Sequence, residues 1–406
     1  MKNLLTTLMV LLIVAAAGTA LAGEGMDWKF YGKLHSSMDY MSNGEEASLT
    51  MSSNTSRFGF KGGQELNENF TFIWQFESAI DMTKKGGGSL ASRNTYVGLK
   101  GNFGQFRFGR HDTPFKTLGR KVEFFSDEMG DFRQMTMGWD RRVDDVVAWL
   151  SPDWSGFGIF GAFQWDQAYS DDDAYHSDVM AKAKTAYSLM AHYTTQSDNP
   201  FFIGAAIEGL SETYAELLPP VPPATDGTYG DAPMGLRVAA KYDAEKFAIS
   251  GLYQNLTNYD GFWTTNTSGA DVYQGTDAMT WGLEALFRAA PKWNVKGSFF
   301  MLNWDKDAAD DAATTDTDES DTKASMIALG VDHVFNKQVK FYVQFLTISN
   351  GDMSPLGIAG TDDPTTGGIE RMFGNGHGTW TSAYIDPVDG KAKTPMGISL
   401  GTVISF

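Results

Sequence analysis

The side chains that carry most protein chemistry are scarce in this sequence. It contains no Cys, which excludes disulfides, thiolate metal sites, cysteine nucleophiles and iron–sulfur clusters. Its six His are scattered, and no pair has a metal-binding spacing such as HExxH. No sequence around a His marks a nucleophile. We therefore expect no enzyme, no cofactor and no resident metal.

Charged side chains are the remaining candidates, and the chemistry they offer is the sorting of ions and polar solutes. The formal net charge of −18 argues against a nucleic-acid partner, because basic patches drive that class of binding. Neighbouring side chains of a strand point to opposite faces, so a base beside an apolar residue marks a polar face. Four bases were assigned in this way, each with its apolar neighbour: Lys33 with Leu34, Arg57 with Phe58, Arg93 with Tyr96, and Arg142 with Val143.

The segments that hold these bases alternate with period two, which predicts β-strands. In residues 70–77, FTFIWQFE, aromatic side chains recur at every second position. A soluble β-sandwich would also alternate, but its buried face favours Val, Ile and Leu. Here the apolar face carries Phe, Trp and Tyr near segment ends, and the polar face carries full charges within strands. That combination is typical of a membrane barrel with a water-filled interior.

Alternation and turn residues together predict sixteen antiparallel strands in an all-β, up-and-down transmembrane β-barrel, wide enough for an aqueous channel. Short turns such as Gly101-Asn102 alternate with long loops, as expected when one end faces the periplasm. The predicted strands are 26–40, 52–62, 69–81, 90–100, 103–115, 142–150, 156–166, 182–194, 201–211, 234–243, 246–256, 278–289, 293–304, 323–334, 338–349 and 395–406.

The third outer loop, about 116–141, is longer than a link between neighbouring strands requires. We expect it to fold inward and to narrow the lumen opposite the basic wall. A basic wall facing an acidic loop would create a transverse field that sorts solutes by charge and dipole. Arg107 shares the inward parity, whereas Arg110 would line the pore only if a bulge intervened.

Other long loops differ in composition. Residues 212–233 include Pro219-Pro220-Val221-Pro222-Pro223, and residues 350–394 form the longest loop. Residues 305–322 hold seven Asp and one Glu but lack the spacing and the Gly of an EF-hand. We interpret this segment as a solvated acidic loop that could bridge surface lipids through divalent cations.

The N-terminus carries an export signal. Residues 1–22 combine Lys2, an apolar stretch from Leu8 to Ala17, and the cleavage pattern Ala20-Leu21-Ala22. The apolar run is too short to span a membrane. The mature barrel domain is therefore expected to cover residues 23–406, and its destination is the outer membrane.

Three runs of the sequence resemble the general porins of Gram-negative bacteria: SRFGFKG at 56–62, RNTYVGLKG at 93–101 and FRFGR at 106–110. Phe406 is similar to the terminal aromatic residue of outer-membrane barrels. The resemblance implies a homotrimer in outer-membrane lipid and lipopolysaccharide, with passive diffusion of small hydrophilic solutes and ions. It places the family's basic constriction cluster on Lys33, Arg57, Arg93 and Arg142, and its acidic loop on Glu123 and Asp127. Val122 stands where the family has Pro, so the path of the loop is open.

Alternative functions remain at this point. A substrate-selective channel for sugars or organic acids would need a row of aromatic side chains on the lumen face. Only Tyr31, Phe160 and Trp304 were assigned there. A barrel enzyme would need a nucleophile at the rim, and a structural barrel would not explain the long third loop. Acidic loops favour cations at the mouth and the basic wall favours anions at the narrowest point, so ion selectivity is open, with cations the favoured interpretation.

Overall fold

The computed structural model describes residues 26–83, 90–136, 139–165, 185–210, 234–257, 263–265, 271–273, 277–305, 323–350 and 393–406. Predictions for the signal 1–22 and for most of the loops 212–233, 305–322 and 350–394 lie outside these residues. None of the described helices is long and apolar enough to cross a membrane.

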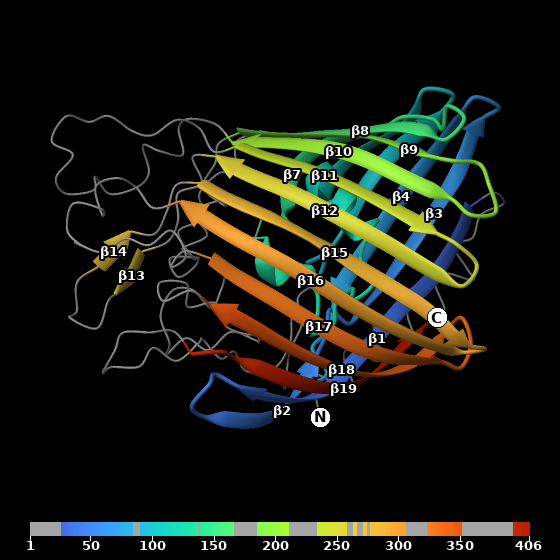
Figure 1. Cartoon of the computed structure of the whole chain (residues 1–406). Helices are drawn as coiled ribbons and strands as arrows, with labels where there is room; N and C mark the ends of the chain where they lie inside the picture. The colour runs from blue at the N-terminus through green and yellow to red at the C-terminus, as the bar shows by residue number, and fades with distance from the viewer. Residues whose placement is uncertain are drawn as a thin grey trace, which may run out of the picture.

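The described chain forms one closed antiparallel barrel (Figure 1). Its strands are β1 (Met26–Ser42), β2 (Ala47–Ser53), β3 (Arg57–Asn67), β4 (Phe70–Ala79), β5 (Thr95–Gly101), β6 (Gly104–Asp112), β7 (Arg142–Leu150), β8 (Phe157–Trp165), β9 (Thr185–Thr194), β10 (Phe201–Leu210), β11 (Met234–Asp243), β12 (Phe247–Thr257), β15 (Asp277–Ala290), β16 (Trp293–Asp305), β17 (Lys323–Val334), β18 (Val339–Asn350) and β19 (Met396–Ser405). A separate hairpin joins β13 (Trp263–Thr265) and β14 (Asp271–Tyr273).

These strands fill sixteen positions around the barrel, as the alternation predicted, because β2 and β3 share one position. The two halves pair with the upper and lower parts of the same strand, β1. The chain between them includes Thr55, whose φ of 54° interrupts the ladder. The predicted strand 52–62 was therefore too short at both ends. The predicted strand 90–100 was too long, since β5 begins only at Thr95.

The barrel is sealed between its first and last strands. Residues Lys33–Ser42 of β1 pair with Met396–Ser405 of β19. At the end of this seam the N–H of Gly32 donates to the carbonyl of Phe406 at 2.9 Å, and the N–H of Phe406 donates to the carbonyl of Gly32 at 3.1 Å. A Cβ at position 32 would meet the Phe406 ring at 2.5 Å, so a larger residue there would require the ring to move.

Alternation around the wall separates a lipid face from a lumen face. In β12, Phe247, Ile249 and Tyr253 are exposed, whereas Ala248 and Leu252 between them are buried. The short turns lie on the right of Figure 1, and exposed aromatic residues lie in or beside them, as in the girdle of a membrane barrel. Members of this girdle are Trp154, Phe157, Tyr242, Phe247, Trp293, Phe335 and Phe341.

Candidate functional site

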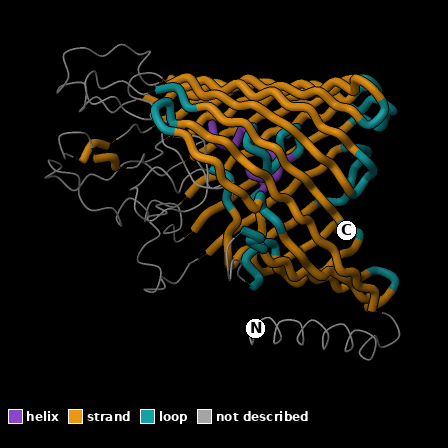
Figure 2. The backbone as a smooth tube through the Cα atoms, turned by 90° about the horizontal axis from the view of Figure 1, so that it is seen from below, coloured by secondary structure: helices purple, strands orange, loops and turns teal. Residues whose placement is uncertain are grey.

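The loop between β6 and β7 enters the barrel, as predicted (Figure 2). It begins with helix α2 (Pro114–Arg120) and later forms the 3-10 helix η1 (Phe132–Met135). Thr113 starts α2, because its hydroxyl accepts a hydrogen bond from the N–H of Lys116 at 3.2 Å and Pro114 follows at the first helical position. We call residues 113–141 the third loop.

The third loop packs an apolar side of its own against half of the barrel wall. Phe115, Leu118, Phe125 and Trp139 have no exposed surface. Phe132 stacks on Phe300 of β16 with 5.2 Å between ring centroids. Burying side chains of this size contributes about 1.5–3 kcal/mol each. The lumen on this side is therefore filled by protein.

Charged groups fasten the same loop to the wall along its length. Most of them are buried, and we call them the anchor contacts: Arg141 to Glu208 at 3.5 Å, Asp140 to Arg237 at 2.8 Å, the N–H of Phe124 to Glu284 at 2.6 Å, and Glu128 to Lys296 at 2.6 Å and to Lys340 at 2.5 Å. Lys296 and Lys340 together hold the pKa of Glu128 at about 2 against the opposing effect of burial. Glu128 is thus ionised at any ordinary pH.

Asp127 of the third loop directly contacts two of the predicted basic residues. Its carboxylate lies 2.8 Å from Lys33 and 3.7 Å from Arg57. It also pairs with Arg120 and, at 3.0 Å, with Arg133. These cations keep the pKa of Asp127 well below its usual range although burial acts to raise it. Lys33 and Arg57 are therefore joined to the loop, with no gap between wall and loop at this point.

Glu123, the other predicted acid, turns toward the loop's own bases. It lies 2.6 Å from Arg120 and 3.6 Å from Arg133. Burial raises its pKa to about 7, and the two arginines oppose that rise only in part. Glu123 can therefore change its charge near neutral pH.

Arg93 and Arg142 lie on the wall, with acidic partners of their own. Arg93 is 2.6 Å from Glu77, and Arg142 is 3.0 Å from Asp112. The parity argument that selected them was wrong in its details. Tyr96 and Val143, assigned to the lipid face, both lie inside: Tyr96 lines the lumen cavity described below, and Val143 lines a small pocket with Glu208.

The backbone explains both errors. Arg93 precedes β5 in an irregular segment where Ala91 has a φ of 56°. In β7 an extra residue shifts the register opposite Gly109 and His111, and Asp145 there has a φ of 50°. Because this bulge belongs to β7, Arg110 of β6 keeps its outward parity and pairs with Asp144.

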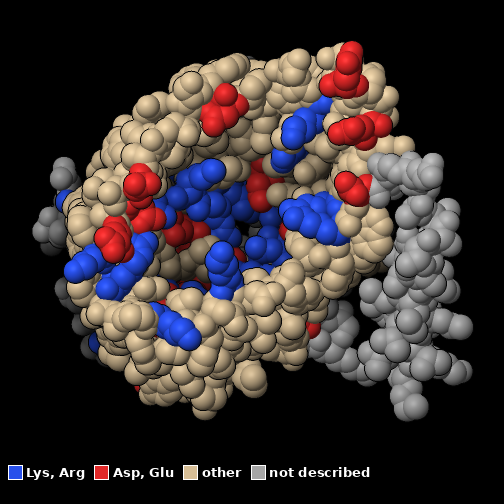
Figure 3. Space-filling view, turned by 90° about the vertical axis from the view of Figure 1, so that its right-hand side faces the viewer, with Lys and Arg blue, Asp and Glu red and all other residues tan. Residues whose placement is uncertain are grey.

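An open cavity of about 630 Å³ remains beside the third loop, between α2 and the wall formed by β4 to β9. Its lining includes Tyr96, Arg107, His111, Phe160 and His192 from the wall. Thr117, Arg120 and Lys121 line it from the loop. Figure 3 looks into the barrel from the short-turn end and shows Lys and Arg side chains gathered around the hollow.

Some charged side chains along this cavity form ion pairs and others do not. Its Asp112 is paired with Arg142 and, at 2.9 Å, with Lys116. Arg107 and Lys121 form no ion pair with any carboxylate in the described part of the chain. The carboxylates of the third loop are likewise matched by cations. Asp153, which also lines the cavity, likewise forms no ion pair in the described part of the chain. Two unpaired cations therefore face one unpaired carboxylate, and the excess charge of these groups is positive.

Sequence reasoning missed the cations that neutralise the loop. Arg120 and Arg133 are loop residues without strand parity, so no periodic signal marks them. Lys296 and Lys340 were accessible in principle, since each alternates with outward apolar neighbours in β16 and β18. They were not selected because the path of the loop toward them was unknown.

Comparison with known proteins agrees with this geometry. Residues 7–352 match the family model of the Gram-negative porins. The chain is 24% identical over 348 residues to the major outer membrane protein P.IB of Neisseria sicca, with 83% of this chain and 90% of that protein covered.

Solved barrels share the fold. An anion-selective porin from Comamonas acidovorans has a TM-score of 0.64 and 18% identity over 94% of this chain and all of that one. In-vitro folded OmpT of Vibrio cholerae in its trimer form has a TM-score of 0.58 and 15% identity over 94% of this chain. Since the family model covers most of its length, the chain belongs to the Gram-negative porin family and is a channel protein of the outer membrane.

Proposed function

We propose that this porin lets small hydrophilic solutes and ions diffuse passively, without catalysis, along the passage between the third loop and the wall of β4 to β9. The observation that carries the proposal is the open cavity beside a loop that is otherwise fastened to the wall. A fastened loop leaves a passage of fixed width, so size sets which solutes pass.

The predicted charged residues are proposed to set selectivity at the narrowest part of this passage. They are Lys33, Arg57, Arg93, Arg107 and Arg142 on the wall, and Glu123 and Asp127 on the loop. Confined water between low-dielectric walls strengthens the field of such groups. Because the loop acids are matched, and among the described lining residues the unpaired cations Arg107 and Lys121 outnumber the unpaired carboxylate of Asp153, the proposed preference is for anions.

The proposed assembly is a homotrimer in lipid and lipopolysaccharide. The trimer form of a structural neighbour and the exposed apolar wall of the barrel support it. Reconstitution in planar bilayers tests channel and assembly together. The expected record is stepwise conductance in groups of three, with a reversal potential in a KCl gradient that reports anion preference. Correctly inserted protein without steps would contradict the channel.

Arg93→Ala is expected to raise the permeability of cations relative to anions. Its removal leaves Glu77, now 2.6 Å from the guanidinium, with only the more distant Arg57 at 3.8 Å. A change of about threefold in the permeability ratio corresponds to about 0.7 kcal/mol, a modest value for one screened charge. An unchanged reversal potential would remove Arg93 from the constriction.

Anion preference is expected to rise as the pH falls from 8 to 6. Glu123 has its pKa raised to about 7, so lowering the pH through that value protonates it and removes one negative charge beside Arg120 and Arg133. Lys116, whose pKa is lowered by burial to about 8, gains charge in the same direction. Reversal potentials of the native protein and of Glu123→Gln separate the two. If Glu123→Gln shifts as much as the native channel, Glu123 does not titrate here.

A further inference from the structure

Arg107 of β6 is a cation held in place by neutral groups. Its Nη1 lies 2.8 Å from Nε2 of His111, and its Nη2 donates to Oε1 of Gln105 at 2.9 Å. The guanidinium carbon lies 4.7 Å above the centre of the Tyr96 ring. Nε is buried and has no hydrogen-bond partner, and Nη1 and Nη2 each carry a second N–H. Arg107 is thus oriented, charged and not fully satisfied.

The contact with His111 leaves that charge intact. Nδ1 of His111 lies 2.7 Å from the carbonyl oxygen of Asp112, which can only accept a hydrogen bond. Nδ1 must therefore carry the proton, and Nε2 must accept from the guanidinium, which can only donate. His111 is consequently neutral in this arrangement, and it acts as a flat ring beside the cation.

Aromatic faces and edges continue from this point along the wall. The ring of Tyr96 lies 5.5 Å from that of His111, and the ring of His111 meets Phe160 of β8 edge-on at 5.6 Å. Met190 and His192 of β9 complete the same side of the cavity. The wall therefore offers the row of lumen aromatics that the sequence alone did not reveal. Tyr96 and His111 are the members of this row that the sequence did not place on the lumen face.

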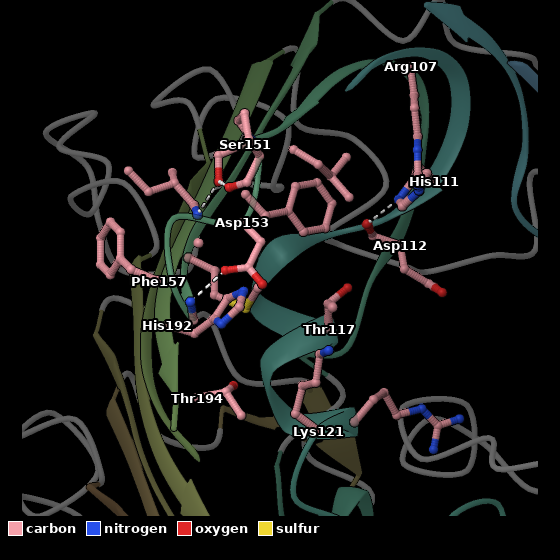
Figure 4. A pocket seen from close by; sticks show the side chains of 18 of the residues that line it. Arg107, His111, Asp112, Thr117, Lys121, Ser151, Asp153, Phe157, His192 and Thr194 are labelled. Carbon is pink, nitrogen blue, oxygen red and sulfur yellow. Dashed lines mark hydrogen bonds between the residues drawn. The ribbon is translucent and has the colours of Figure 1, made fainter. Parts of the chain in front are cut away.

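The third loop supplies a second cation across the cavity. Lys121 follows α2, is exposed to the lumen, and has no carboxylate partner among the described residues. Figure 4 shows Arg107 and His111 on one side of the cavity and His192 on the other, with Thr117 and Lys121 of the loop below. A solute in the cavity can thus meet aromatic rings and two unpaired cations, against one unpaired carboxylate, Asp153, among the described lining residues.

We propose that this cavity is a binding subsite for small aromatic carboxylates on their way through the channel, an inference that rests on the proposed diffusion function. The carboxylate would pair with the guanidinium of Arg107, with the charge of Lys121 adding from the loop side, while the ring packs against Tyr96 and Phe160. A charge-assisted bond to an oriented guanidinium and ring packing add to each other. A cavity of about 630 Å³ accommodates a single-ring acid. A neutral sugar would not pair with either cation, and an aliphatic anion would not pack a ring against the aromatic side chains.

Block of single-channel KCl current by benzoate, added at the short-turn end, tests the subsite. Two comparison solutes separate its parts: cyclohexanecarboxylate keeps the charge without a flat ring, and benzyl alcohol keeps the ring without the charge. Benzoate is expected to block at about millimolar concentration, at least fivefold below either comparison solute. Equal block by cyclohexanecarboxylate would show that only charge is recognised and would overturn the proposal.

Arg107→Gln is expected to raise the half-blocking concentration of benzoate about tenfold, the effect of losing one charge-assisted hydrogen bond. Arg110→Gln is the matched control, because Arg110 lies on the same strand, faces outward and pairs with Asp144. It removes the same charge without touching the cavity and should leave the block unchanged. An equal effect of both variants would indicate a general field and contradict a local site.

Phe160→Leu provides a second measurement that leaves every charge in place. It is expected to weaken benzoate block about threefold without moving the KCl reversal potential. No effect of either Phe160→Leu or Arg107→Gln on the block would overturn the subsite. Failure of the channel itself is distinguishable, because native protein would then show no conductance steps in KCl alone. Steps without benzoate block would refute the subsite and leave the channel standing.

Discussion

Asp127→Asn is expected to shift selectivity strongly toward anions and to loosen the third loop. Asp127 is buried among Lys33, Arg57, Arg120 and Arg133, so neutralising it leaves these cations with less acid. Breaking a buried ionic contact costs about 3–5 kcal/mol. Asn suits the test, since it tolerates the φ of 59° at this position. The backbone is therefore unstrained, and the effect reports charge.

Reversal potential, single-channel conductance and trypsin cleavage measure this prediction. The anion-to-cation permeability ratio should rise about tenfold, and conductance should rise as the loop separates from Lys33. Trypsin should cut within the loop, which contains Lys116, Arg120, Lys121 and Arg133. Asp153→Asn is the control, because it removes the same charge from a residue that lines the cavity, forms no ion pair in the described chain and does not belong to the third loop. Equal shifts of the permeability ratio in the two variants would contradict a specific role of Asp127 in selectivity.

Lys296→Met is expected to destabilise the folded protein by about 3 kcal/mol and to raise the noise and size of the open-channel current. Lys296 is fully buried between Glu128 of the loop at 2.6 Å and Asp332 of β17 at 3.0 Å. Without Lys296, the carboxylates of Glu128 and Asp332 pair only with Lys340, which is partly exposed. The loss therefore weakens an anchor contact and leaves buried negative charge.

Unfolding by urea in lipid vesicles and single-channel recording measure these two effects. Lys61→Met is the control: Lys61 belongs to β3, lies 4.8 Å above the Tyr31 ring, and forms no ion pair in the described part of the chain. It removes the same charge from the opposite wall and should change the unfolding free energy by less than about 1 kcal/mol. A stable Lys296→Met variant with native conductance would mean that the anchor contacts do not hold the loop.

Much of the fold was predictable because period-two alternation reports the two faces of a barrel wall directly. The sixteen strand positions of the barrel and the inward third loop were confirmed. The errors fall where the backbone leaves regular geometry. Thr55 interrupts one strand, Ala91 delays another, and Asp145 shifts a register. Such residues break the alternation of inward and outward side chains, so the face of a residue cannot be predicted by counting across them.

The candidate site was predictable only on the wall side. Parity selected Lys33 and Arg57 correctly as inward residues, and their contact with Asp127 follows from the path of the loop. That path depends on long-range packing of Phe115, Phe125 and Trp139 against distant strands, for which the loop sequence carries no periodic signal. The side chain of Trp304, assigned to the lumen row, lies outside the described residues.

The seam between β1 and β19 joins the two most distant strands of the sequence. Contacts of such long sequence separation form late, because chain entropy opposes them until the intervening strands are in place. Until then, both edges present unpaired backbone groups that invite pairing with other molecules. Sealing should therefore be the slow and aggregation-sensitive step of biogenesis, and a chaperone or insertion partner that shields these edges would act before Phe406 reaches Gly32.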